Sequence, residues 1–459
     1  MPKQAKFTQG STLWHVITMS VTGALGLMFM FLVDLVDMLF LSMLEQQEAV
    51  AAVGFASSIV FFTISLSIAV SISATALVSR AVGAGDMRLA KRRAVNVLAY
   101  GVVFSSFMVW FLWPKIPHLL LYIGASGRTL DLATDYLQIL IFGMPAVMIG
   151  MIGSGIMRAI GDARRAMYAT LVGGVVNALL DPILIFAFGL EVQGAAIASL
   201  IARFSMVGVT YYGVVHIHNM LGRFDLYDFM QDFKAISVIC IPAMLTNLSS
   251  PLANAIVMEH AADFGDDAVA AIAIIGRIIP VVFGGLFALS GAVGPILGQN
   301  LGAGHFERMQ NTLTSGVVYS LGYCVILCWA LYLGQHWLAQ TFNATHETAE
   351  LMRFFATYIS FSFFFQSLLF IGIATFNNLG RPYMSTLLNF GRATLGTWPL
   401  ITVFAWVLDA KGILLGQAVG SIIFGCIGFS LARRYIAELE LRNATDVVLE
   451  TDLSYDELG

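Results

Sequence analysis

The chain contains twelve uninterrupted stretches of about 20 or more mostly apolar residues, each long enough to cross a membrane as a helix. Its 459 residues are 58% hydrophobic and only 11% charged, whereas roughly a quarter of the residues in a soluble globular domain are charged. The stretches do not alternate apolar and polar residues in segments of about ten, as the strands of a membrane β-barrel do. The sequence therefore predicts an all-α, polytopic membrane protein.

The stretches are divided evenly, with six in each half of the chain. They cover residues 13–44, 50–78, 94–113, 133–157, 167–189, 194–214, 236–262, 268–296, 315–333, 352–376, 384–408 and 412–433. The first stretch is far longer than the apolar part of a secretory signal peptide and lacks a cleavage pattern. We therefore expect it to be the first of twelve transmembrane helices.

Two short motifs recur at one fixed displacement. The segment Glu48-Ala-Val-Ala-Ala-Val53 returns as Asp267-Ala-Val-Ala-Ala-Ile272, and Val82-Gly-Ala-Gly-Asp86 returns as Leu301-Gly-Ala-Gly-His305, in both cases 219 residues later. This period is far longer than the roughly 20 to 50 residues of a solenoid repeat. It indicates a duplicated unit, so we predict two pseudo-symmetric lobes of six helices each.

Lysine and arginine are distributed unequally between the loops on the two sides of the predicted membrane. Seventeen of them lie on the side that holds the N-terminus, namely Lys3, Lys6, Arg80, Arg88, Lys91, Arg92, Arg93, Arg158, Arg164, Arg165, Arg223, Lys234, Arg308, Arg381, Arg433, Arg434 and Arg442. The other side has only Lys115, Arg128, Arg353 and Lys411. Because positive charge accumulates in cytoplasmic loops, both termini are predicted to be cytoplasmic.

These observations divide the chain into four parts. Residues 1–214 form the predicted N-lobe, 215–235 a cytoplasmic linker, 236–435 the C-lobe, and 436–459 an acidic cytoplasmic tail. The tail ends in several acidic residues and is predicted to be disordered.

Four polar residues in the apolar stretches of the first half form two pairs with helical spacing. Asp34 and Asp37 are three residues apart, and Asn177 and Asp181 are four apart, so each pair shares one face of its helix. An ionisable side chain at the membrane centre costs at least about 2.5 kcal/mol, which makes such residues candidates for function. We therefore predict a binding site for a cation or a substrate here.

Two occupants fit this predicted site. Two carboxyl groups held close together away from water can take up and release a proton near neutral pH. The carboxyl oxygens, together with the Asn177 amide and the Ser199 hydroxyl, could instead surround a sodium ion. A purely structural alternative is that Asp37 reaches interfacial water and that Asp181 satisfies backbone groups released by Pro182.

The second half of the chain lacks these acids. Its equivalent positions are Ile256, Thr394 and Trp398. Its own intramembrane charges include Arg277 and Arg392, which we expect to be ion-paired structural residues. The acidic chemistry is therefore predicted to be confined to the first lobe.

The order of several motifs resembles the multidrug and toxic compound extrusion (MATE) transporters, in particular their DinF-like branch. The motifs are Val36-Asp37, Glu48-Ala-Val-Ala-Ala-Val53, Val82-Gly-Ala-Gly-Asp86, Arg158-Ala-Ile-Gly-Asp162, Asn177-x-x-x-Asp181-Pro182 and Gly194-Ala-Ala-Ile-Ala198. The resemblance covers essentially the whole chain. It implies two six-helix lobes around a central cleft that opens alternately to the two sides of the membrane.

The resemblance also implies roles for individual residues. Asp37, Asn177 and Asp181 match the cation site of the N-lobe, Ser199 matches a hydroxyl on the sixth helix, and Tyr136 matches a tyrosine that lines the same cavity. Asp34 has no counterpart in the family pattern.

Two departures from the family pattern stand out. Sodium-coupled members similar to NorM carry carboxylates in the seventh and tenth helices, where this chain has Ser250 and Leu368. The first helix has no proline, so Gly23 and Gly26 are its candidate hinges.

The function implied is efflux of amphipathic, often cationic drugs by antiport, with H⁺ favoured as the coupling ion and Na⁺ as the alternative. We expect no cofactor, no nucleic-acid partner and no enzymatic activity, but a monomer surrounded by lipid in the bacterial inner membrane. The rival function is a flippase for lipid-linked precursors, which would require a basic cavity.

Overall fold

The computed structural model of the protein describes residues 5–44, 47–342 and 344–456, and every regular element in these ranges is a helix. The long helices are α1 (Thr12–Ser42), α2 (Gln47–Gly83), α3 (Met87–Leu112), α5 (Gly127–Leu140), α6 (Met144–Ala159), α7 (Ala163–Pro182), α8 (Glu191–Tyr211), α9 (Leu226–Ala262), α10 (Asp266–Val282), α11 (Gly284–Gly302), α12 (Phe306–Thr341), α14 (Ser362–Leu379), α15 (Pro382–Ala393) and α16 (Trp398–Asp456). The shorter elements are η1 (Lys6–Thr8), η2 (Trp113–Lys115), α4 (Ile116–Tyr122), η3 (Ile141–Gly143), η4 (Ile183–Ala187), η5 (Tyr212–Ile217), α13 (His346–Phe354) and η6 (Phe355–Ile359).

Within the described ranges, ten helices are long and apolar enough to cross a membrane, and the bent pair α10 and α11 makes an eleventh span. One of the ten, Pro382–Ala444, is two spans because the chain reverses at Asp409, which has a φ of 52° and a ψ of −141°. Close contacts define the reversal: Gly412, Gly416 and Gly420 lie against Phe404, Ile401 and Gly396 respectively, so the two stretches are antiparallel. The predicted twelve spans are therefore confirmed.

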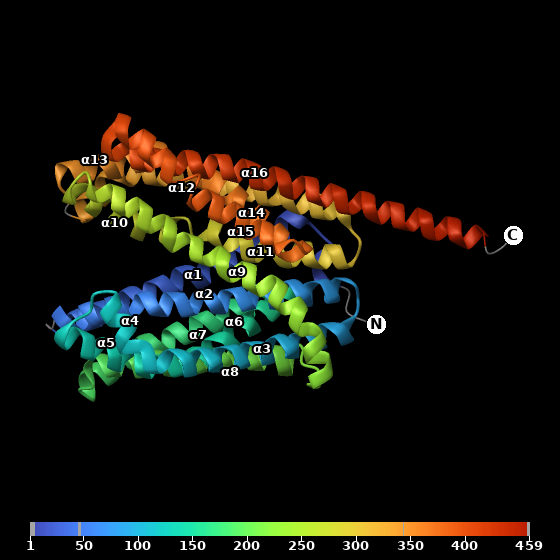
Figure 1. Cartoon of the computed structure of the whole chain (residues 1–459), viewed down its shortest axis with the longest axis horizontal. Coiled ribbons are helices and arrows are strands. Elements are labelled where there is room, and N and C mark those ends of the chain that lie inside the picture. The colour runs from blue at the N-terminus through green and yellow to red at the C-terminus, as the bar shows by residue number, and fades with distance from the viewer. Residues whose placement is uncertain (1–4, 45–46, 343, 457–459) are drawn as a thin grey trace.

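The two lobes exchange the first half of one helix each. Residues Val16 and Met19 of α1 belong to a hydrophobic core built mainly from α11, α12 and α14. Conversely, Ile236 and Cys240 of α9 belong to the core formed by α2, α3 and α6. Figure 1 shows α9 crossing diagonally from the N-lobe to the C-lobe. This mirrored exchange is the structural counterpart of the sequence repeat.

The connection between the lobes is shorter than the predicted linker 215–235. The element η5 continues to Ile217, and α9 begins at Leu226. Asp225 starts this helix because its side chain accepts hydrogen bonds from the backbone N–H groups of Tyr227 (2.8 Å) and Asp228 (3.1 Å). The non-helical part of the connection is therefore confined to residues 218–225, between η5 and α9.

The end of the chain also differs from the prediction. Helix α16 continues to Asp456, through most of the segment predicted to be a disordered tail. Arg442 and Glu438 form an ion pair one turn apart in this segment. Such pairs at four-residue spacing favour a helix.

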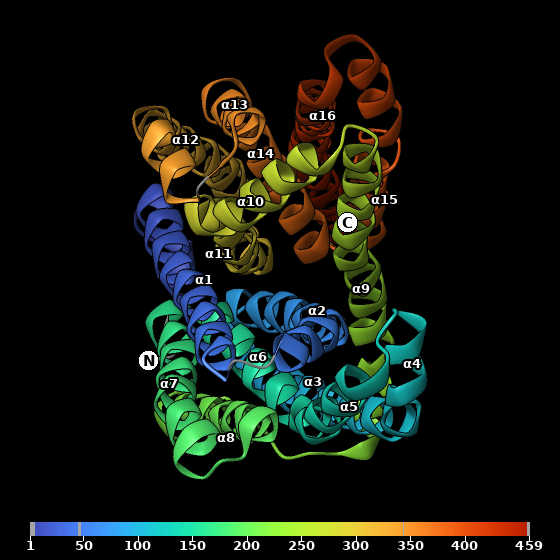
Figure 2. The same cartoon turned by 90° about the vertical axis from the view of Figure 1, so that its left-hand side faces the viewer.

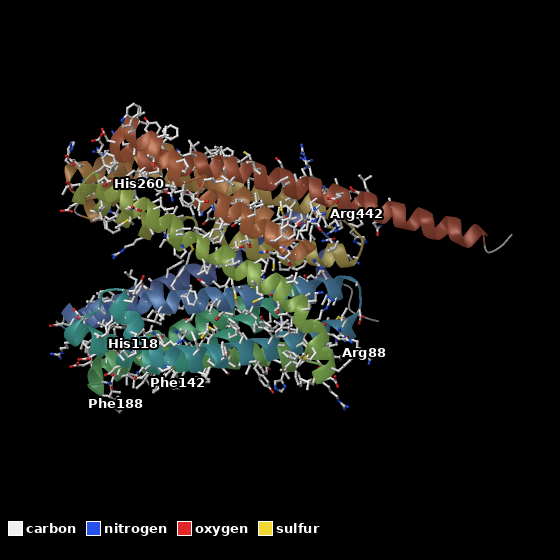
Figure 3. The ribbon with its side chains drawn as sticks, viewed as in Figure 1. Arg88, His118, Phe142, Phe188, His260 and Arg442 are labelled. Carbon is white, nitrogen blue, oxygen red and sulfur yellow. The ribbon has the colours of Figure 1, made fainter. Side chains whose placement is uncertain are left out.

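One end of the molecule, which we call the basic end, holds both termini together with Arg88 and Arg442 (Figures 1 and 3). The lobes are tightly joined there. Arg80 of α2 donates hydrogen bonds from Nε (2.8 Å) and Nη2 (2.5 Å) to the carbonyl oxygen of Asn378 in α14. Gln299 of α11 donates to the Ala159 carbonyl (2.7 Å) and accepts from the Phe7 N–H (2.8 Å).

Glycines allow α2 and α11 to approach closely at the basic end. A Cβ added to Gly298 would overlap the Ser79 hydroxyl, and one added to Gly83 would overlap the backbone of Gln299. Small residues at such a crossing let helix backbones approach within van der Waals contact. The basic end is therefore closed by backbone-level packing as well as by hydrogen bonds.

Asp162 fastens the start of α7 to the residue that follows η5. Its carboxylate accepts from the Arg165 N–H (3.2 Å), forms an ion pair with the Arg165 guanidinium and hydrogen bonds to His218 Nε2 (2.7 Å). Burial alone would raise the pKa of Asp162, but the hydrogen bonds from Arg165 and His218 outweigh it and lower the pKa below its ordinary value.

We expect Asp162→Asn to lower the melting temperature of the detergent-solubilised protein at pH 6. Because the pKa of Asp162 is lowered in the folded state, its stabilising contribution is present above the ordinary value of 3.8 and is lost as the pH falls below it. The difference between variant and wild type should therefore shrink at pH 3. Asp162→Ala, which also removes the helix cap, should cost about a further 1 kcal/mol. An equal difference at both pH values would contradict this role of the charge.

Candidate functional site

Asp37, Asn177 and Asp181 meet in the N-lobe, where α1 packs against α7. The Asn177 side-chain amide donates to Asp37 Oδ1 at 2.8 Å and to Asp181 Oδ2 at 2.9 Å. Asn177 and Asp181 are brought to one face by their four-residue spacing on α7. The structure thus places three of the predicted site residues in direct contact.

A glycine permits this meeting of α1 and α7. A Cβ on Gly174 would lie 2.6 Å from a ring carbon of Phe29 and 2.8 Å from a methyl group of Val33, closer than real Cβ contacts. Gly174 lies one turn before Asn177, and Val33 lies one turn before Asp37. The close approach of the two helices therefore places Asp37 beside the polar face of α7.

The two carboxyl groups are also neighbours, because both accept a hydrogen bond from the same Asn177 amide. Two neighbouring carboxyl groups can hydrogen bond to each other only when one of them carries a proton. Asp181 is 1% exposed and Asn177 5% exposed, so water cannot easily replace these contacts. The arrangement suits a site that holds one proton between two acids.

One oxygen of this cluster has no partner. Among the described residues, nothing donates a hydrogen bond to the buried Asp181 Oδ1. The neighbouring Asn177 amide cannot do so, because it already donates to Asp37 Oδ1 and Asp181 Oδ2. A buried carboxyl oxygen without a donor is costly. It can be satisfied by a bound cation, by a proton, or by a donor on a transported molecule.

Tyr136 of α5 and Ser199 of α8 form the adjoining part of the site. Tyr136 lies beside Ser199 and within electrostatic range of both Asp37 and Asp181. Ser199 makes no described hydrogen bond to either acid. Among the described residues, Ser199 is therefore linked to the acids through Tyr136.

Arg203 was missed by the sequence analysis. It lies four residues after Ser199 on α8, within electrostatic range of Tyr136, and its Nη1 donates to the Leu140 carbonyl at 2.9 Å. Its spacing from Ser199 was the available signal, because residues four apart share a helix face. Arg203 therefore places a positive charge beside Tyr136.

The remaining predicted site residue cannot be placed. Asp34 lies on α1 one turn before Asp37, but its side chain is outside the described part of the structure. No group of three or more His, Cys, Asp or Glu side chains in the described ranges is arranged to hold a metal ion.

Among its described residues, the C-lobe has no equivalent acidic cluster. Arg392 of α15 instead belongs to a hydrogen-bond network with uncharged side chains. Its Nε donates to Asn389 Oδ1 (3.4 Å), and Asn389 Nδ2 donates to the Ser249 hydroxyl (2.6 Å). Neither Arg277 nor Arg392 forms an ion pair with any described residue, so the expectation that both are ion-paired is wrong.

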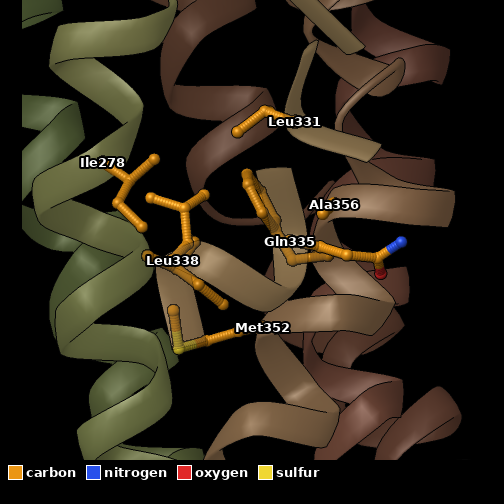
Figure 4. A pocket seen from close by; sticks show the side chains of 8 residues that line it. Ile278, Leu331, Gln335, Leu338, Met352 and Ala356 are labelled. Carbon is orange, nitrogen blue, oxygen red and sulfur yellow. The ribbon is translucent and has the colours of Figure 1, made fainter. Parts of the chain in front are cut away.

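A pocket in the C-lobe lies between α10, α12, α13 and η6 (Figure 4). The side chains of Ile278, Leu338 and Met352 point towards one another inside it, and Gln335 is its only polar lining residue. With no charged group, this pocket lacks the chemistry to couple transport to an ion.

A family model described as MatE matches the chain twice, over residues 23–183 and 242–402. The second match begins and ends 219 residues after the first, which is the displacement of the sequence repeat. The two matches include the candidate site residues Asp37, Tyr136, Asn177 and Asp181 in the first half.

Two relatives have described activities. The chain is 28% identical to a FAD transporter of Shewanella oneidensis over 425 residues, which is 91% of this chain and 94% of that protein. It is 24% identical to the multidrug export protein MepA of Staphylococcus aureus over 337 residues, covering 72% and 73% of the two chains.

Solved structures share the fold. One titled as a MATE in complex with MaL6 has a TM-score of 0.89 at 22% identity and covers 96% of this chain and 100% of its own. Another, titled as the outward-facing conformation of a multidrug resistance MATE family transporter of the MOP superfamily, has a TM-score of 0.89 at 22% identity and covers 95% and 99%.

Proposed function

Because the chain belongs to the MatE family of membrane transporters, we propose that it exports amphipathic small molecules in exchange for protons. The observation that carries the proposal is the buried contact between Asp37, Asn177 and Asp181. Drug export is supported by the similarity to MepA. Sodium is the alternative coupling ion, held by the same carboxyl and amide oxygens.

The proposed coupling is competition for one charged site. When Asp37 and Asp181 are ionised, they attract a cationic compound, and when they are protonated, they release it. Each proton that enters can contribute about 2.3 kcal/mol per 100 mV of membrane potential. It contributes about a further 1.4 kcal/mol per unit of pH gradient. A small number of protons is therefore enough to support a large concentration ratio of the exported compound.

The closed basic end supports a transport cycle of alternating access. We propose that this end faces the bacterial cytoplasm, as the excess of lysine and arginine indicates, and that the protein works as a monomer in the inner membrane. The state in which the lobes are joined at the basic end would then be open towards the outside of the cell. Breaking the contacts of Arg80 and Gln299 would open the cytoplasmic side.

A second candidate function is export of a flavin dinucleotide. The similarity to the FAD transporter extends over 91% of this chain, a larger share than the similarity to MepA. This candidate retains the same fold and the same acidic site but requires recognition of a negatively charged molecule.

We expect inside-out vesicles to accumulate a fluorescent cationic dye when their lumen is acidified, because the lumen corresponds to the outside of the cell. An outwardly directed sodium gradient without a pH difference should not drive uptake. Uptake driven by sodium alone would mean that Na⁺ is the coupling ion in place of H⁺. No gradient-driven uptake of either the dye or FAD would overturn the proposal of export.

A further inference from the structure

Arg277 is an exposed arginine within the membrane-spanning pair α10 and α11. It lies 11 residues after the start of α10, which corresponds to about 16 Å along the helix. No described residue forms a hydrogen bond or an ion pair with it. An unpaired guanidinium at this depth is costly unless it meets water or a ligand.

The orientation of Arg277 follows from the packing of α10. Ala268, Ala271 and Ile275 of this helix are buried in a core shared with α12, α13 and α14. At 100° per residue, Arg277 lies 200° from Ile275 and so points away from that core. Ala273 and Val281, on the same side as Arg277, are also exposed. Helix α10 lies on the side of the C-lobe that faces the N-lobe in both views (Figures 1 and 2).

The lobes separate at the depth of Arg277. The last described hydrogen bond between the lobes towards the end opposite the basic end runs from Asn247 Nδ2 of α9 to the Ser65 carbonyl of α2, at 3.2 Å. Beyond it, Pro251, Asn254 and Met258 continue the face of α9 that carries Asn247, and all three are exposed. This face of α9 is therefore exposed from this point outwards.

Helix α2 presents two aromatic side chains to the same space. Its Ser73 hydroxyl contacts α9 through the Ile236 carbonyl (3.4 Å), and its Ser79 lies against Gly298 of α11. By helical periodicity, Phe62 lies on the same face of α2 as Ser73, which meets α9. Phe61 lies on the same face as Ser79, which meets α11. They are 38% and 53% exposed.

Arg277 and the two phenylalanines occupy a similar depth. Val269 and Ile272 of α10 pack with Val257 and Ala261 of the antiparallel α9. Continuing this antiparallel pairing along both helices places Arg277 beside the turn of α9 that begins at Pro251. This turn follows Asn247, whose side chain donates to the Ser65 carbonyl. Phe61 and Phe62 lie one turn from Ser65, the other partner in that bond.

The geometry points to Arg277 as the residue that binds an oxyanion, a phosphate or a carboxylate, on an aromatic molecule in the space between the lobes. A guanidinium matches such a group with two parallel hydrogen bonds. The exposed rings of Phe61 and Phe62 provide flat apolar surface for an aromatic ring system. Exposed Asn254 adds a neutral hydrogen-bonding group. This inference rests on the proposed export function and assigns its substrate class.

The two lobes would then differ in polarity. The N-lobe holds the acidic pair Asp37 and Asp181, and the C-lobe presents Arg277 to the same space. An anionic aromatic substrate would bind to the C-lobe in one step of the cycle, and the N-lobe acids would take up protons after it has been released. A cationic dye would depend on the acids and not on Arg277.

Flavins provide matched probes, because riboflavin lacks the phosphate that FMN carries on the same ring system. Binding to the purified protein can be measured by quenching of flavin fluorescence. We expect Arg277→Gln to weaken FMN binding at least tenfold and to leave riboflavin binding unchanged. Arg277→Lys should retain most FMN binding, and Arg88→Gln, an exposed arginine at the basic end, should retain all of it.

Transport separates this inference from the proposed function. Arg277→Gln should lose proton-driven uptake of FMN into inside-out vesicles while uptake of the cationic dye stays at the wild-type level, which also shows that the variant is folded. Equal losses of FMN and riboflavin binding in Arg277→Gln, or wild-type protein that transports the dye but does not bind FMN, would overturn the role of Arg277. Failure of wild-type protein to transport the dye, FMN and FAD alike would instead overturn the export function.

Discussion

Asp37→Asn should reduce proton-driven uptake into inside-out vesicles by about 100-fold or to background. Asparagine keeps an oxygen that can accept the hydrogen bond from Asn177, so the packing of α1 on α7 is retained. It cannot bind a proton, so the pair with Asp181 loses one of its two titratable groups. Export would then have no means to draw on the proton gradient, which by itself supplies about 1.4 kcal/mol per pH unit.

The same measurement on Asp181→Asn should give the same result, because both acids are needed to hold one proton between them. Asp135→Asn is the matched control, since Asp135 is an exposed acid in the same lobe that contacts only Gln193 among the described residues (3.1 Å). Wild-type uptake in either Asp37→Asn or Asp181→Asn, with normal insertion and gel-filtration behaviour, would refute the coupling role of the pair.

Arg80→Ala should open the basic end. The substitution removes both hydrogen bonds from the charged guanidinium to the Asn378 carbonyl. Hydrogen bonds to charged groups contribute roughly 1.5–3 kcal/mol each, and about 1.4 kcal/mol is a tenfold change in an equilibrium. The population open at this end is therefore expected to rise at least tenfold.

Opening can be measured by the rate of maleimide labelling of Ser79→Cys. Ser79 is fully buried against Gly298 in the closed arrangement. The labelling requires a background in which Cys240, Cys324, Cys328 and Cys426 are replaced by alanine or serine. Arg80→Ala should accelerate labelling about tenfold, and Arg88→Ala, which removes an exposed arginine near the same end, should not. Identical rates in the two variants would mean that packing of α2 on α11 alone keeps the basic end closed.

The two lobes respond to different features of a transported molecule under these proposals. Loss of Asp37 should affect every substrate, because it removes the driving ion. Loss of Arg277 should affect only substrates with an anionic group. This difference in pattern makes the two sites separable in one set of vesicles.

Much of the architecture could be predicted from the sequence. Apolar length fixes the number of spans, because a helix must satisfy its own backbone hydrogen bonds across the membrane. The 219-residue displacement predicted two related lobes, and the family match begins and ends at the same displacement in both halves. Even the face shared by Asn177 and Asp181 followed from their spacing.

The site itself needed the packing of helices that are distant in the sequence. Nothing in the sequence states that Asp37 lies against Asn177, because that contact depends on Gly174 admitting the side chains of Phe29 and Val33. Arg203 was overlooked for the same reason, since its relevance comes from α8 lying beside Tyr136 of α5. Arg277 was expected to be ion-paired, and only the packed orientation of α10 shows that it points away from the core of its own lobe.

The sequence by itself determined the spans, the duplication and the acids of the first lobe, because hydrophobic length, repeat spacing and the helical period are local properties of a chain. The tertiary structure alone decided which helix faces meet, where the lobes part and which charges remain unpaired. Those properties depend on close contacts between helices, where a single glycine or an added Cβ decides whether two side chains can touch.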